Sequence, residues 1–234
     1  MMETSLFFHI STKIDIKILD NNIGDYMSNE LKKLVHEIKN PLAVCNGYLE
    51  MINHSESEIN KKYINIIKQE LIRSLEIINE YTMYHKIKKL QYEEIEIKKF
   101  ITNLIKTNFQ FTNSKIMINI NKPIYFQGDY NKLKQVFINI IKNSIEAKYK
   151  EPLIINIGAK KIDNSLIIKI KDNGVGISRE SLPKIYSLFY TTKQTGTGIG
   201  VSICKEIIEL HDGTIKYKSN LYKGTEVTIS LPIK

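Results

Sequence analysis

Helical periodicity dominates residues 27–89, and this feature constrains the fold of the chain most. At 100° per residue, the apolar side chains of residues 27–53 fall in one stripe. These side chains are Leu31, Leu34, Ile38, Leu42, Cys45, Leu49 and Ile52. Residues 57–89 repeat the pattern with a broader stripe, after a short break in which Ser57 is a candidate N-cap. The sequence therefore predicts a hairpin of two long helices.

A hairpin with so broad a stripe cannot bury all of its apolar surface by itself. Pairing with a second copy into a four-helix bundle would close that surface. We therefore expect a homodimer. Pro41 lies inside the first helix, where the missing N–H and the ring predict a bend.

The pattern changes after Lys89, where alternating β-branched segments are interleaved with helical ones. Strands are predicted over 92–97, 115–121, 153–160, 166–171, 214–218 and 225–231, and helices over 98–111, 129–148 and 199–211. This order indicates an α+β sandwich with helices on one face of a sheet. The predicted domains are a short N-terminal strand or arm over 1–25, the helical hairpin over 26–90 and the sandwich over 91–234.

Composition limits the classes of function. Both cysteines, Cys45 and Cys204, lie in apolar runs, as expected of small core residues in a reducing compartment. The sequence contains no apolar run of about 18 residues, which predicts a cytoplasmic chain without direct membrane insertion. The net charge of +9 comes from scattered lysines. It favours an acidic partner or an anionic ligand, or is simply solvated, and it does not call for nucleic acid.

His36 lies about 160° from the apolar stripe of the first helix, so its imidazole is predicted to face water. Asn40, one turn later, shares that face. A lone surface histidine needs no functional explanation. Its meaning depends on three polar clusters in the second half of the chain.

The first cluster is a pair of amides, Asn139 and Asn143, on a helix that is otherwise strongly apolar. Their i, i+4 spacing places them on one face. Either amide alone could be an ordinary surface residue. Two amide oxygens on one face also suit Mg²⁺ held together with phosphates.

The second and third clusters are rich in glycine. Asp172 ends a predicted strand and precedes Gly174 and Gly176, so the backbone can approach a flat ligand while the carboxylate accepts a hydrogen bond from an exocyclic amine. Residues 191–200 run into a helix whose amide groups can bind phosphate. Each motif alone is weak, because DxGxG is a common turn and the GxGxG fits neither the Walker nor the Rossmann spacing.

Taken in this order, the motifs resemble those of a sensor histidine kinase over about residue 27 to the C-terminus. The similar segments are an H-box at 36–42, an N-box at 139–147, a G1 box at 172–176, an F-box at 188–193 and a G2 box at 196–200. The short F-box, Phe-Tyr-Thr-Thr-Lys, is most similar to soluble or sporulation-type kinases. The resemblance implies a dimerisation and phosphotransfer domain followed by a Bergerat (GHKL) ATP-binding domain.

The resemblance also implies roles for individual residues. His36 would be phosphorylated by ATP, with Glu37 orienting the ring, and Asn40 would position water when a regulator is dephosphorylated. Asn143 with Asn139 would hold Mg²⁺, and Asp172 would bind the adenine amine. The remaining nucleotide-binding residues implied are Gly174, Gly176, Ile177, Thr192, Lys193, Gly196, Thr197, Gly198, Gly200 and Thr225. The implied partner is the receiver domain of a response regulator.

Departures from the family pattern are small. Val201 stands where leucine is usual, and Ser144 where alanine is usual, and both changes are expected to leave ATP binding intact. No membrane sensor or PAS-sized domain precedes Tyr26, so the stimulus is expected to arrive through the N-terminal arm or through a sensor or inhibitor protein.

Two other functions compete with the kinase. A histidine phosphotransfer adaptor would receive phosphate on His36 and no longer use ATP, but the intact glycines and both asparagines argue against it. A Bergerat-type ATPase that works by conformational gating would carry a general-base Glu where this chain has Asn139.

Overall fold

The computed structural model describes residues 29–52, 57–86, 90–149, 151–193 and 196–233. The strand or arm predicted over 1–25 lies outside these ranges. The chain divides into two compact units. One is built on two long helices, and residues 191–197 group with it; the other comprises 86–190 and 198–234. Within the described residues, no helix combines the length and the apolar character needed to cross a bilayer.

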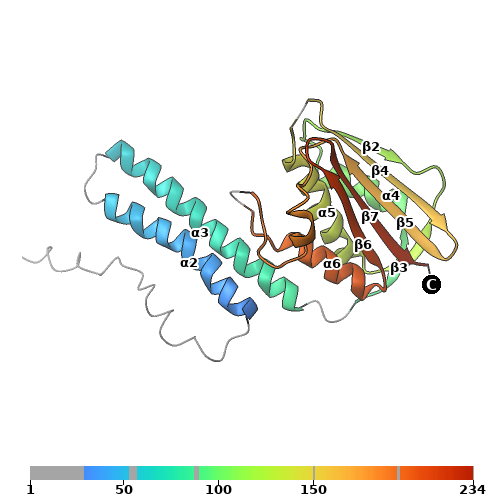
Figure 1. Ribbon diagram of the computed structural model, residues 1–234, viewed down its shortest axis with the longest axis horizontal. Coiled ribbons are helices and arrows are strands. Elements are labelled where there is room, and N and C mark those ends of the chain that lie inside the picture. The colour runs from blue at the N-terminus through green and yellow to red at the C-terminus, as the bar shows by residue number, and fades with distance from the viewer. Residues whose placement is uncertain (1–28, 53–56, 87–89, 150, 194–195, 234) are drawn as a thin grey trace, which may run out of the picture. The chain divides into compact units, whose positions relative to one another are not determined.

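The helical unit is the predicted hairpin. Helix α2 spans Asn29–Ile52 and continues through Pro41, and α3 spans Ser57–Lys86 (Figure 1). The two helices run antiparallel, as two cross-contacts show. The Cys45 thiol lies 3.6 Å from the Ile67 carbonyl oxygen, and the Tyr48 and Tyr63 rings are 5.2 Å apart. Leu34, Cys45 and Ile77 are buried between the helices.

Much apolar surface of the hairpin remains exposed, as its broad stripe predicts. The large apolar side chains that are exposed on the two helices are Val44, Met51, Ile59, Ile64, Leu71, Ile72, Leu75 and Ile78. Among them, Ile64, Leu71, Leu75 and Ile78 fall within about 60° around α3 at 100° per residue. The hairpin therefore presents a continuous apolar strip that its own helices do not cover.

The second unit is an α+β sandwich. Its sheet has the order β2-β4-β5-β7-β6, in which β2 runs parallel to β4 and the other pairs are antiparallel. The strands are β2 (Lys115–Asn119), β4 (Ile154–Ile162), β5 (Ser165–Asp172), β6 (Thr214–Asn220) and β7 (Gly224–Pro232). Helices α4 (Ile97–Asn108), α5 (Tyr130–Glu146) and α6 (Gly200–Leu210) cover one face, as Figure 1 shows. The predicted fold class is confirmed.

The core lies between the helices and that face of the sheet. Alternate residues of β5, namely Leu166, Ile168 and Ile170, are fully buried, while Lys169 and Lys171, on the opposite face of the strand, are exposed. On the helical side, Ile140 and Ile141 of α5 and Ile203 and Ile207 of α6 are equally buried. The period of two on the strands and of 3.6 on the helices produces this arrangement.

Two elements were not predicted. The four-residue strand β3 (Tyr125–Gly128) pairs antiparallel with β1 (Glu93–Glu96), and a 3₁₀ turn, η1, covers Leu182–Lys184. In the sequence, the four residues of β3 look like the loop before α5, because β3 leads directly into that helix through Asp129. Asp129 was predicted inside the helix, but it is the N-cap, and its Oδ1 accepts from the Lys132 N–H at 3.0 Å.

Candidate nucleotide and phospho-acceptor sites

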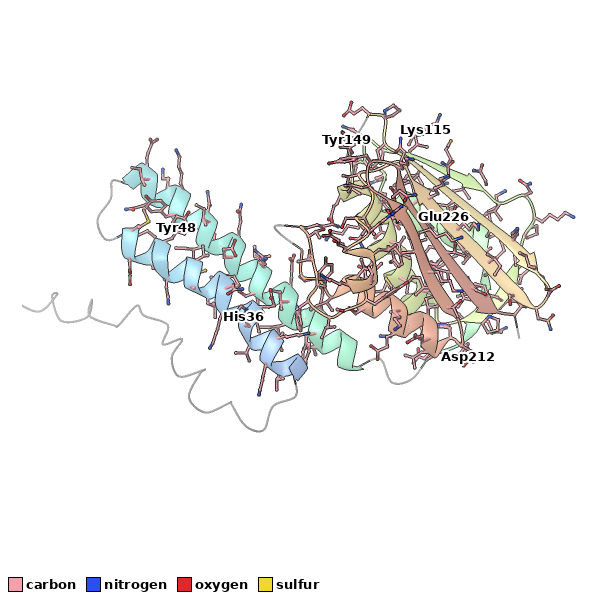
Figure 2. All side chains as sticks on the ribbon, viewed as in Figure 1. His36, Tyr48, Lys115, Tyr149, Asp212 and Glu226 are labelled. Atoms are coloured by element: carbon pink, nitrogen blue, oxygen red, sulfur yellow. The ribbon has the colours of Figure 1, made fainter. Side chains whose placement is uncertain are left out.

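His36 is exposed on α2, and so is Asn40 one turn further on, as the helical period predicts (Figure 2). Glu37, beside the histidine, is half-buried. Leu34 points the other way and is buried, so the helix holds the imidazole on its outer surface. A nucleophile in this position is accessible to a separate domain or protein.

In the sandwich unit, the Asp172 carboxylate is held by three donors from three segments. Its Oδ1 accepts from the backbone N–H groups of Gly174, at 2.9 Å, and Thr225, at 3.1 Å. Its Oδ2 accepts from the hydroxyl of Ser144 at 3.0 Å. Asp172 and Ser144 are each only 4% exposed. The carboxylate is therefore fixed in direction at the end of β5.

Glycine at positions 174 and 176 permits close contact between the loop after β5 and its neighbours. A Cβ on Gly174 would lie 2.5 Å from the Ala147 carbonyl oxygen. Gly176 has φ +73, and a Cβ there would lie 2.2 Å from the Asn220 carbonyl oxygen. Both contacts are too short for any side chain, so these positions require glycine.

The loop is also fastened to β6 and β7. The Ile177 N–H donates to the Ser219 hydroxyl oxygen at 2.8 Å, and that hydroxyl lies 2.9 Å from the hydroxyl of Thr225. Ser219 donates in turn to the Gly224 carbonyl oxygen at 2.9 Å. The predicted residues Ile177 and Thr225 thus belong to one hydrogen-bonded cluster with Asp172, which Ser219 completes.

A second cluster joins α5 to the start of α6. The Asn139 side-chain amide donates to the Gly200 carbonyl oxygen at 3.4 Å. This bond commits the amide nitrogen, so the amide oxygen is the atom that can face a cation. Asn143 lies one turn further along the same face of α5 and is half-buried. The two residues thus fit a hard cation that takes few protein oxygens.

The start of α6 has the features of an anion site. Ile199 precedes the helix, and its apolar side chain cannot cap the first amide groups. Gly198 has φ +71, and a Cβ there would lie 2.4 Å from the Phe189 carbonyl carbon. Gly198 and Gly200 therefore let the chain turn sharply into a helix whose N-terminus is available to phosphate.

Helix α5 connects the two clusters. Asn139 and Asn143 belong to the cluster at α6, whereas Ser144, the next residue, contacts Asp172. At 1.5 Å per residue, Asn139 and Ser144 are about 7 Å apart along the helix axis. One rigid element therefore sets the spacing between the carboxylate and the amide pair.

The remaining predicted residues are Thr192, Lys193, Gly196 and Thr197. They belong to residues 191–197, which group with the helical unit. The sandwich unit by itself does not bring them to Asp172 or Asn139, and their contact with nucleotide stays a prediction.

Sequence reasoning missed three residues that build the Asp172 cluster. Ser144 and Ser219 supply the hydroxyl contacts, and Gly224, at φ +91, would place a Cβ 2.1 Å from the Asp172 carbonyl oxygen. Ser144 was noticed only as a departure from the family pattern. Gly224 precedes the predicted residue Thr225, but its contact with β5 depends on strand pairing, which is not readable along the sequence.

Cys204 lies against Asn139 in the interior of the unit. Burial raises the pKa of the Cys204 thiol to about 12, and the nearby Asn139 side chain opposes that rise only in part. The thiol is therefore protonated at neutral pH and directed at the Val136 carbonyl oxygen, 3.7 Å away. It acts as a core residue, as predicted, and not as a nucleophile.

Two family models match the chain. Residues 26–89 match the His Kinase A (phospho-acceptor) domain, and residues 128–234 match the histidine kinase-, DNA gyrase B- and HSP90-like ATPase. His36 lies in the first match and the Asp172 and Asn139 clusters lie in the second.

Curated relatives are bacterial kinases. Sporulation kinase C of Bacillus subtilis (strain 168) is 36% identical over 86% of this chain and 48% of its own length. Sporulation kinase B of the same organism is 34% identical over 85% of this chain and also 48% of its own length. The chain thus spans about half the length of these relatives.

Solved structures of histidine kinases match the fold of both units. Histidine kinase ThkA in complex with the response regulator protein TrrA is 29% identical, with a TM-score of 0.72 over 87% of this chain and 61% of that chain. The isolated catalytic domain of ThkA is 28% identical, with a TM-score of 0.55 over 62% of this chain and 97% of that chain. With a phospho-acceptor domain followed by an ATPase domain of the same class, the chain belongs to the histidine kinase family.

Proposed function

We propose that this chain is an ATP-dependent histidine autokinase that phosphorylates His36 and passes the phosphoryl group to an Asp of a response regulator. One observation carries the proposal. A phospho-acceptor domain that exposes His36 is followed by an ATPase domain in which a fixed, buried carboxylate, Asp172, ends a strand beside two obligatory glycines.

The chemistry at His36 is an in-line displacement. A ring nitrogen attacks the γ-phosphorus of ATP, a nitrogen–phosphorus bond forms, and the bond to the bridging oxygen breaks to release ADP. Before the attack, the other ring nitrogen carries the imidazole proton, so the attacking nitrogen is unprotonated. After the attack, the neighbouring Glu37 accepts that proton. Catalysis consists mainly of positioning and charge neutralisation.

The nucleotide roles follow the two clusters. Asp172 accepts a hydrogen bond from the adenine amine, and Gly174, Gly176 and Ile177 shape the pocket for the ring. Thr225 serves the adenine side through water. Gly198 and Gly200 present the N-terminus of α6 to the phosphates, and Thr192, Lys193, Gly196 and Thr197 add to phosphate binding. Mg²⁺, when bound through Asn143 and Asn139, neutralises phosphate charge.

The proposed assembly is a homodimer formed by the exposed apolar strip of the hairpin. The proposed partner is a response regulator receiver domain, by similarity to ThkA, which has been solved with its regulator TrrA. Asn40, exposed one turn from His36, would position water for dephosphorylating the regulator. A sensor or inhibitor protein would deliver the stimulus. Both described cysteines are buried free thiols, which supports action in the cytoplasm.

Incubation with ATP labelled at the γ-phosphate tests the proposal. We expect acid-labile, base-stable label on the wild-type chain and none on His36→Gln, because no other group replaces the nucleophile. His54→Gln, a histidine outside the motif, is the matched control and should keep its label. Equal label on wild type and His36→Gln contradicts the assignment.

Two further outcomes identify the alternatives. An unlabelled wild type that gains label from a phosphorylated regulator would indicate a phosphotransfer adaptor. ATP turnover that survives His36→Gln would indicate a gating ATPase. Transfer from the labelled chain to purified response regulators, compared by initial rate, identifies the partner.

A further inference from the structure

Ser144 is the third hydrogen-bond donor to the Asp172 carboxylate and comes from a different element than the other two. It lies on α5, directly after Asn143, and its hydroxyl is 3.0 Å from Oδ2. Both side chains are buried. The resemblance noted from the sequence assigns that carboxylate to adenine and assigns no role to the hydroxyl of Ser144.

The acceptor capacity of the carboxylate shows what this hydroxyl does. An ionised carboxylate offers about four lone-pair directions. Two on Oδ1 are taken by the N–H groups of Gly174 and Thr225, and one on Oδ2 by Ser144. One direction on Oδ2 is left. That number matches the single hydrogen bond that an exocyclic amine would donate to this atom.

We propose that Ser144 is a positioning residue for adenine: its hydroxyl donates to Asp172 Oδ2 when a purine covers the carboxylate and excludes water, and so raises the affinity for ATP. This inference rests on the proposed function, because it assumes that Asp172 binds the adenine amine.

The direction of the effect follows from comparing the free and the bound pocket. In a nucleotide-free pocket that water can enter, water replaces the hydroxyl as a donor to Oδ2 at little cost. Once a base covers the carboxylate, that water is excluded, and without Ser144 one lone pair stays unsatisfied. A buried unsatisfied acceptor is costly. Ser144 therefore stabilises the bound state more than the free state.

The requirement for a donor at the 6-position of the base comes from Asp172 itself, because an ionised carboxylate oxygen can only accept. Adenine presents an amine there and guanine presents a carbonyl oxygen. Ser144 leaves that requirement unchanged and acts on how well the carboxylate is hydrogen-bonded once a base covers it.

The test compares Ser144→Ala with Ser202→Ala in the full chain. Ser202 is the matched control, because it is also a buried serine of the sandwich unit, and its hydroxyl donates to the Tyr186 carbonyl oxygen at 3.1 Å. Calorimetry gives the Kd for ATP, and labelling of His36 at varied ATP gives KM and kcat. Competition binding with purine riboside triphosphate, which has no 6-amino group, shows whether the effect needs only a base that covers the carboxylate.

We expect Ser144→Ala to raise the Kd and KM for ATP about three- to tenfold, the range for one hydrogen bond, with kcat at saturating ATP unchanged. Affinity for purine riboside triphosphate should fall by a similar factor, because that base also covers the carboxylate and excludes water from Oδ2. Ser202→Ala should leave all of these values near wild type.

An unchanged Kd in Ser144→Ala, or an equal loss in Ser202→Ala, overturns the inference, as does an affinity for purine riboside triphosphate that does not fall. A lower kcat with unchanged KM also overturns it. Failure of the proposed function looks different, because the wild-type chain itself would then neither bind ATP nor label His36.

Discussion

The two units of this chain bury their apolar surface in different ways. The sandwich encloses its core between three helices and a five-stranded sheet and places a hydrogen-bonded polar cluster at the edge of that core. The hairpin buries little beyond Leu34, Cys45 and Ile77 and leaves a strip of large apolar side chains on α3 exposed. The sandwich buries its core within its own fold, whereas the proposed dimer would cover the exposed apolar strip of the hairpin.

This difference matches the chemistry of each unit. A site that must recognise one nucleotide needs groups fixed in advance, and Asp172 is fixed by donors from the loop after β5, from β7 and from α5. On the proposed function, the ATP-binding unit and then a response regulator must reach His36, which requires exposure, and His36 is exposed. The strain and the hydrogen bonds therefore concentrate in the sandwich and the exposed apolar surface in the hairpin.

Association of the hairpin is the largest effect that we predict. Leu71→Asp with Leu75→Asp places charges on the exposed apolar strip, where the wild-type residues are 41% and 59% exposed. A symmetric dimer contains each substitution once in each copy, so each charge is added to the interface two times. We therefore expect association to weaken at least about a thousandfold. Sedimentation velocity at micromolar concentration measures this.

The control for the strip is Glu76→Ala, which changes an exposed polar residue of the same helix. It should leave the dimer intact, and the double variant should still bind ATP with wild-type affinity. A wild-type chain that sediments as a monomer would remove the basis of the comparison between the two units.

Nucleotide binding is the next largest effect. In Asp172→Asn the side-chain carbonyl oxygen can still accept from Gly174 and Thr225, but the new NH₂ would face the adenine amine as a donor facing a donor. The Ser144 hydroxyl would have to turn so that it accepts from the NH₂. We expect the Kd for ATP to rise on the order of a hundredfold. Calorimetry measures it, with Asp163→Asn as control.

Asp163 is a fair control because it is exposed in the turn between β4 and β5 at φ 50, a conformation that Asn adopts easily. This substitution removes the same charge without touching the polar cluster. Equal losses in the two variants would mean that overall charge, and not the Asp172 site, governs ATP binding.

These two predictions also show what the sequence could and could not provide. The helical period placed His36 and Asn40 on the outer surface of α2, because a helix face is set by residues three and four apart. The Asp172 glycine loop was identified by the local DxGxG string. Both are local patterns, and both could be predicted.

The missed contacts of the Asp172 cluster, and the missed strand β3, are long-range. The hydrogen bond from Ser144 to Asp172 joins residues 28 apart in sequence. Position 224 requires glycine because β7 begins against the end of β5. The strand β3 escaped prediction because its four residues pair with β1, which lies about thirty residues away. Such contacts depend on strand pairing and helix docking, which no periodicity along the chain reveals.

Substituting one glycine in each unit compares the stability of the two units. Gly224→Ala would place a Cβ 2.1 Å from the Asp172 carbonyl oxygen at φ +91, so we expect the sandwich to lose about 2 kcal/mol or more. Gly47 lies inside α2 with nothing within 4 Å of its Cβ position. Gly47→Ala should therefore stabilise the hairpin by about 0.5–1 kcal/mol.

Urea unfolding of both glycine variants, followed by a probe in each unit, separates the two effects. The test is whether the two substitutions change the free energy of unfolding in opposite directions. A Gly224→Ala chain as stable as wild type would mean that β7 and β5 can separate at this point, and the Asp172 site would then be less rigid than we infer.

The smallest expected effect concerns the buried cysteines, one in each unit. Burial raises the pKa of both thiols, that of Cys204 to about 12. The folded state therefore retains a proton on Cys204 that the unfolded chain releases near pH 9, so this stability is complete below pH 9 and is lost as the pH rises towards 12. Between pH 7 and pH 9 the loss should stay under about 1 kcal/mol.

Alkylation with iodoacetamide at pH 8, read by mass spectrometry, distinguishes the two thiols. Cys204 should be nearly inert, because at pH 8 a thiol with a pKa of about 12 holds roughly a thousandfold less thiolate than one in the unfolded chain. Cys45 should react first, because a two-helix hairpin opens more easily than a sandwich core. Weakening the dimer with Leu71→Asp and Leu75→Asp should speed the reaction of Cys45 and leave Cys204 unchanged. The reverse order would mean that the sandwich is the less stable unit.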